Sequence, residues 1–153
     1  MCRILIQSII VFSLFVGFTG CSDDPDVDVF VNAFNVTIDG ETHNFDDFVI
    51  TEFQDPHRVN VRAMDGDFDM RMNINLVNPA GTYPIWFNGG MYSYSVDLPG
   101  GTFWGLDPDK GSIIITDNDV DNRKFVATFS LTGEQEGNNN TVDITNGKVQ
   151  FTY

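Results

Sequence analysis

From Phe68 to Leu76, apolar and polar residues alternate without a break, and few folds can accept such a pattern. The apolar positions are Phe68, Met70, Met72, Ile74 and Leu76, with polar or charged residues between them. In a β-strand successive side chains point to opposite faces, so this spacing gathers all the apolar side chains on one face. An α-helix, with 3.6 residues per turn, would scatter them around its axis. The pattern therefore predicts a half-buried strand.

The same period of two, interrupted by turn residues, recurs along most of the chain. Asp39-Gly40 and Asn146-Gly147 favour tight hairpin turns, and Asn-Gly in particular suits a type I′ turn. About nine short strands with polar turns and no helical pattern predict an antiparallel β-sandwich, with a closed β-barrel as the alternative. The expected strands are 34–38, 41–45, 48–53, 58–64, 68–76, 91–96, 112–116, 124–131, 141–145 and 148–152.

The beginning of the chain has the features of an export signal. Arg3 and the amino terminus are positive, and residues 4–18 are mostly apolar, in a run shorter than the roughly 20 residues that a membrane-spanning helix needs. Phe18-Thr19-Gly20 stands directly before Cys21, an arrangement that resembles the lipobox of bacterial lipoproteins. The resemblance implies that residues 1–20 are removed and that Cys21 is acylated and anchored in the outer membrane. An uncleaved anchor and an ordinary secretory signal are the less favoured interpretations.

Residues 21–29 form an acidic segment between this signal and the first predicted strand. Ser22-Asp-Asp-Pro-Asp-Val-Asp28 lacks apolar periodicity, which predicts an extended tether. Acidic residues directly after the lipidated cysteine also resemble the surface-export signal of Bacteroidetes lipoproteins. A single β-sandwich domain of residues 30–153 is expected beyond the tether, facing the cell surface or the periplasm.

Charge and cysteine content limit the possible partners and stabilising bonds. The formal net charge is −14, and such a field repels phosphate, so no nucleic acid partner is expected. The two cysteines are Cys2, in the signal, and Cys21, which is assigned to the lipid. No disulfide can then form within the domain, and the hydrophobic core must stabilise it alone.

Three stretches carry a broader resemblance. Phe125 to Gly133, Val142 to Phe151 and, near the mature start, Phe34 to Gly40 are similar to small Bacteroidetes cell-envelope lipoproteins of unknown function. The resemblance implies an all-β, membrane-tethered domain. It implies no catalytic residue and no particular ligand.

Neither nucleophilic catalysis nor a zinc site is favoured by the sequence. The only histidines are His43 and His57, no nucleophile-elbow pattern is present, and Cys21 is assigned to the lipid. The protein is therefore not expected to be an enzyme. Pairs of carboxylates are too numerous for their spacing to identify a glycan hydrolase, which remains a distant third interpretation.

One turn has the alternating carboxylates that calcium prefers. Asp117, Asp119 and Asp121 occupy every second position before Asn122, although the sequence does not fit an EF-hand loop. They are a possible calcium site, the only cofactor that the sequence suggests. The alternative is that these residues simply form a β-turn.

Residues 82–105 are rich in glycine and aromatic residues. Trp86, Tyr92, Tyr94 and Trp104 lie among short polar residues and could form a platform for a sugar or a peptide. The alternative is that these rings fill the core. The sequence therefore predicts a lipid-anchored envelope lipoprotein that is a ligand-binding module for a glycan or a protein, and the alternative is a purely structural envelope lipoprotein.

Overall fold

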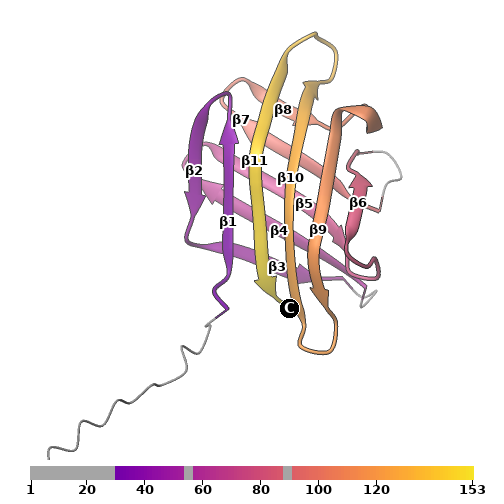
Figure 1. The fold of residues 1–153 in the computed structure, drawn as a ribbon. Coiled ribbons are helices and arrows are strands. Elements are labelled where there is room, and N and C mark those ends of the chain that lie inside the picture. The colour runs from indigo at the N-terminus through magenta and orange to yellow at the C-terminus, as the bar shows by residue number, and fades with distance from the viewer. Residues whose placement is uncertain (1–29, 54–56, 88–90) are drawn as a thin grey trace, which may run out of the picture.

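The computed structural model describes residues 30–53, 57–87 and 91–153, and these form an antiparallel β fold (Figure 1). Within them the chain has eleven strands and a single short 3₁₀ helix, η1 (Pro108–Lys110). The predicted all-β class is confirmed. The strands are β1 (Ala33–Ile38), β2 (Glu41–Phe45), β3 (Phe48–Glu52), β4 (Arg58–Asp65), β5 (Phe68–Asn75), β6 (Gly81–Pro84), β7 (Ser93–Leu98), β8 (Gly101–Trp104), β9 (Gly111–Asp119), β10 (Lys124–Gln135) and β11 (Thr141–Thr152).

The strands form two layers. One layer has the order β2-β1-β11-β10-β9-β6, and the other has the order β3-β4-β5-β7-β8. In Figure 1 the first layer lies in the foreground and its strands cross those of the second obliquely. The end of β10 joins the layers, because Glu134 and Gln135 pair with Trp104 and Phe103 of β8. At the opposite side the chain passes from β2 to β3, so the sandwich is nearly closed.

The core lies between the layers and follows the alternation of the sequence. In β5, Phe68, Met70, Met72 and Ile74 are buried, as the pattern predicts. Phenylalanines of the foreground layer pack against them and one another, with the rings of Phe34 and Phe129 5.9 Å apart. Since burial of a large apolar side chain contributes about 1.5–3 kcal/mol, this core can stabilise the domain without a disulfide.

The hairpin predicted at Asn146-Gly147 is wrong. These residues lie inside the single long strand β11, where only Asn146 has a positive φ, of 50°. Phe129 pairs with Gly147 and Leu131 pairs with Ile144, so Ser130 lies opposite two residues of β11. This is a β-bulge, and its extra residue keeps the apolar side chains on both sides of it facing the core. A bulge and a type I′ turn both favour Asn or Gly, which explains the error.

Candidate functional site

The outer face of the β4–β5–β7–β8 sheet carries the candidate site. Alternation places the apolar side chains of these strands in the core and their polar side chains outside. Strand register then brings residues of four strands into one row, because Arg62 pairs with Arg71, Arg71 with Ser95 and Ser95 with Trp104. A second row, of Asn60, Asn73 and Ser93, runs beside it.

An aromatic pair stands at the β8 end of this face. The ring centroids of Phe87 and Trp104 lie 4.4 Å apart at an interplanar angle of 61°, so the two rings form a corner. The backbone N–H of Phe87 donates to the carbonyl of Gly105 at 2.6 Å, which holds Phe87 beside the end of β8. Phe87 is 44% exposed and Trp104 is partly exposed. Two apolar ring surfaces are therefore available at the edge of a polar face.

A hollow of about 130 Å³ lies next to the aromatic corner, and Ser95 lies in its lining. Ser95 is only 9% exposed and is the only buried polar residue in the described part of the chain. Its hydroxyl forms no hydrogen bond with the described residues, and it is not among the fully buried polar atoms that lack a partner, so it is accessible in the hollow. Polar groups and the two rings surround it, and the complete lining is Asn60, Arg71, Asn73, Phe87, Ser93, Tyr94, Ser95 and Trp104.

The row of amides beside Ser95 forms a directed chain of hydrogen bonds. The amide nitrogen of Asn60 donates to the side-chain oxygen of Asn73 at 2.9 Å, and the amide nitrogen of Asn73 donates to the hydroxyl oxygen of Ser93 at 2.9 Å. Ser93 accepts in this chain, so its own hydroxyl hydrogen remains available to a ligand in the hollow. The amide chain also fixes the rotamers of these side chains.

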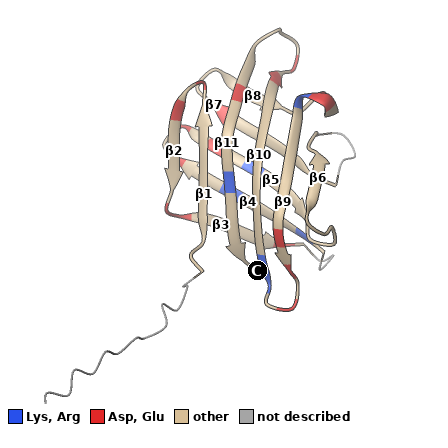
Figure 2. Cartoon of the chain, in the orientation of Figure 1, with Lys and Arg blue, Asp and Glu red and all other residues tan. Residues whose placement is uncertain are grey.

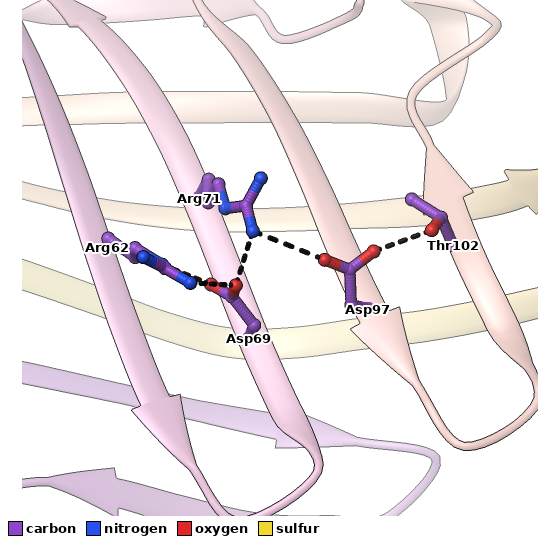
Figure 3. A network of polar contacts seen from close by, with 5 residues as sticks. All are labelled: Arg62, Asp69, Arg71, Asp97 and Thr102. Atoms are coloured by element: carbon purple, nitrogen blue, oxygen red, sulfur yellow. Dashed lines mark hydrogen bonds and ion pairs between the residues drawn. The ribbon is translucent and has the colours of Figure 1, made fainter.

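Charged residues on the same face neutralise one another (Figure 3). Arg62 donates to both carboxylate oxygens of Asp69, at 2.9 and 2.6 Å, and Arg71 donates to Asp69 at 2.5 Å. Arg71 also lies 3.5 Å from Asp97, which accepts a hydrogen bond from the hydroxyl of Thr102 at 2.6 Å. Two arginines thus face two carboxylates, and the network has no net charge.

This network should make folding stability depend on pH. The hydrogen bond from Arg62, assisted by that from Arg71, holds the pKa of Asp69 below its usual range. Asp69 therefore stabilises the fold above the ordinary carboxyl pKa near 4, and this contribution is lost as the pH falls through the lowered pKa. Because Arg62 and Arg71 are partly exposed to solvent, we expect Asp69→Asn to lower the free energy of unfolding by only about 1 kcal/mol at pH 7. The difference from the unsubstituted chain should shrink at acid pH.

Urea melts between about pH 7 and about pH 2 would measure this effect. Asp67→Asn is the matched control, because it removes the same charge from the exposed turn before β5, outside the network. A difference between the unsubstituted chain and Asp69→Asn that stays constant with pH would contradict the assigned role of Asp69.

The four aromatic residues predicted as one platform are not brought together. Tyr92 and Tyr94 are buried, so for these two rings the alternative holds that they fill the core, although Tyr94 also borders the hollow. The hydroxyl of Tyr94 donates to the carbonyl of Thr132 at 2.9 Å, and that of Tyr92 donates to the carbonyl of Asn75 at 3.2 Å. Burial raises the pKa of Tyr92 to about 12 and raises that of Tyr94 as well.

The two tryptophans have different positions. Trp104 lines the hollow, as the platform hypothesis requires. Trp86 is partly exposed, but it is absent from the lining, and its backbone N–H donates to the carbonyl of Tyr92 at 3.1 Å. Phe87 takes the place that the sequence hypothesis gave to Trp86. Ser95 was not predicted either, although the alternation of Tyr94, Ser95 and Val96 was a signal for it.

The turn predicted to bind calcium is held by hydrogen bonds of its own. Asp119 accepts from the backbone N–H of Asn122 at 3.0 Å and from its side-chain amide at 2.6 Å, and these bonds lower the pKa of Asp119. Across the described residues, no three acidic, histidine or cysteine side chains form a group that could hold a metal ion. The geometry thus gives no support to a calcium site at Asp117, Asp119 and Asp121.

A larger hollow, of about 470 Å³, lies over the bulge on the outer face of the other layer. Its lining includes Ser112, Ile114, Thr128 and Lys148, together with Asn146 at the bulge. These side chains are short or exposed, and none is both polar and buried. The smaller hollow beside Trp104 therefore has the stronger features of a binding site, since a few fixed polar groups beside aromatic surface are typical of ligand pockets.

Acidic residues dominate the surface of the domain. Figure 2 shows them in the turns and near the ends of many strands, with few cations between them. The described ranges contain no helix long and apolar enough to cross a membrane. Cys21 and the acidic tether lie outside the described residues. No protein-family model matches the sequence, and no curated protein is significantly similar to it.

Proposed function

We propose that this protein is a lipid-anchored lipoprotein of the cell envelope and that it binds a glycan or protein ligand on the outer face of the β4–β5–β7–β8 sheet. The observation that carries the proposal is the corner of Phe87 and Trp104 beside the accessible hydroxyl of Ser95, which bonds to no described residue. Exposed aromatic surface next to polar groups that are free to form hydrogen bonds is typical of ligand-binding sites.

The anchor in this proposal is supported by the sequence. Cys21 follows an apolar signal and precedes an acidic tether, and β1 begins only twelve residues later, at Ala33. A short tether would keep the domain close to the outer membrane, where a binding face can meet ligands of the envelope or the cell surface. The strongly acidic surface keeps such a domain away from anionic lipid head groups.

A soluble chain from residue 22 onward, without the lipidated cysteine, would test binding on a glycan array. This chain contains the whole described core, so it retains the site without the lipid. We expect Trp104→Ala to lower the affinity by roughly thirtyfold, since a central tryptophan contributes about 2 kcal/mol to binding. Phe87→Ala should also weaken binding.

Phe53→Ala is the matched control. Phe53 follows β3 and is 45% exposed, against 44% for Phe87. Its substitution therefore removes an equally accessible ring that lies outside the hollow. Equal losses in the Phe53 and Phe87 variants would contradict the proposed site. A chain that binds neither glycans nor envelope proteins would instead favour a purely structural envelope lipoprotein.

A further inference from the structure

We infer that the site takes an uncharged sugar, seated as a single pyranose ring against Trp104. This inference rests on the proposed ligand-binding function and names the class of ligand. It combines four properties of the hollow: its size, its aromatic corner, its free hydroxyl groups and its lack of net charge.

The size of the hollow limits what it can enclose. At about 130 Å³ it is well below the roughly 300–1,000 Å³ of pockets that enclose a drug-sized ligand. It therefore accommodates one ring or one side chain, while the remainder of a larger ligand lies on the sheet face or in solvent. This fits a terminal residue of a glycan.

The aromatic corner offers the surface that a sugar ring needs. One face of a pyranose presents C–H groups, and such a face packs on the flat, electron-rich surface of an aromatic ring. Trp104 is fixed in register beside Ser95, and Phe87 meets it at 61°, so the second ring forms a wall. A ring ligand in the corner would contact both.

The polar groups around the corner match the hydroxyls of a sugar. The Ser95 hydroxyl has no partner among the described residues, and the Ser93 hydroxyl accepts from Asn73 while its hydrogen remains available. Each hydroxyl can donate one bond and accept others, so vicinal sugar hydroxyls can bond to both serines. An apolar side chain of a peptide would offer no hydrogen-bond partner to either serine hydroxyl.

Charge selects against acidic ligands at this face. Arg62 and Arg71 are neutralised by Asp69 and Asp97, and the chain as a whole has a formal net charge of −14. A carboxylate placed in the hollow would have to compete with Asp69 for Arg71 and would be repelled by the net charge of the protein. A neutral ring meets neither obstacle, and it can still accept hydrogen bonds from Arg71.

Titrations with matched sugars would test the inference. The probes are the methyl glycosides of glucose and galactose, and the control ligands are those of glucuronic and galacturonic acid, in which a carboxylate replaces the C6 hydroxymethyl group. We expect binding of a neutral glycoside that is unchanged between about 0.1 and about 1 M salt, a range over which the Debye length falls from about 10 to about 3 Å. Ser95→Ala should weaken that binding about fivefold to tenfold, whereas Ser112→Ala, on the opposite layer, should not.

Three results would overturn the inference. Preference for the uronides, or binding that weakens with salt, would show that the site takes an anion. Equal affinity of the Ser95→Ala variant and the unsubstituted chain would show that the ligand does not use the Ser95 hydroxyl. In either case, binding that is still lost in Trp104→Ala would leave the proposed function standing. If no neutral glycoside binds but a peptide does, and the peptide binding is lost in Trp104→Ala, the sugar inference is rejected and the proposed binding site is kept.

Discussion

Replacing Gly147 with valine is expected to lower the free energy of unfolding by about 3 kcal/mol or more. A Cβ atom at this position would lie 2.4 Å from Cε2 and 2.5 Å from Cδ2 and Cζ of Phe129. The ring of Phe129 is itself buried and packs against Phe34, so it cannot move aside without opening a cavity. Branching at Cβ makes the clash of valine worse than that of alanine. Thermal or urea melts would measure the loss.

Gly100→Ala is the matched control for this substitution. Gly100 lies between β7 and β8, and a Cβ atom there meets no heavy atom within 4 Å. Its variant should therefore melt close to the unsubstituted chain. A second variant, Phe129→Ala combined with Gly147→Val, should lose less than the sum of the two single changes, because the first removes the ring that the second displaces. Equal melting of Gly147→Val and Gly100→Ala would contradict the packing at the bulge.

Changing Cys21 to serine is expected to leave an unlipidated chain and so to abolish lipid anchoring of the domain. Each buried methylene contributes about 0.8 kcal/mol, so several acyl chains on Cys21 would make spontaneous release negligible, whereas a serine carries no thioether-linked lipid. The membrane fraction and metabolic palmitate labelling would both report the change. Cys2→Ser is the control, since Cys2 lies within the signal and should not affect either measurement. Palmitate label retained by the Cys21→Ser variant would contradict lipidation at this residue.

The long strands were predictable because their sequences repeat one signal many times. In β5, every second residue is apolar over the whole strand, so the sequence itself defines one apolar face. This is the face that is buried in the core. The four-residue strands β6 and β8 lack enough residues to show a period and were missed. Glycine and proline also occur in them, and both are depleted in strands.

Positions that depend on pairing between distant strands were not predictable. Asn146-Gly147 has the residues of a hairpin turn, and only the register of β10 against β11 distinguishes it from a bulge. Ser95 and Trp104 become neighbours only because β7 pairs with β8. The burial of Tyr94, by contrast, agrees with the alternation of its strand, because Tyr94 and Val96 lie on the same apolar face. The hydroxyl of Tyr94 donates to a backbone carbonyl, so burial leaves this polar group paired.

The central claim is that a ligand binds at the aromatic corner, and a nuclear magnetic resonance titration of the ¹⁵N-labelled chain from residue 22 onward would locate it. The chain has two tryptophans, so its spectrum has two indole N–H signals, and Trp86→Phe assigns them. On addition of a neutral methyl glycoside, we expect shifts in the indole signal of Trp104 and in the backbone amides of Ser93 and Ser95, with little change at Lys148 on the opposite layer. Shifts centred on Lys148, with the Trp104 signal unmoved, would contradict the assignment of the site.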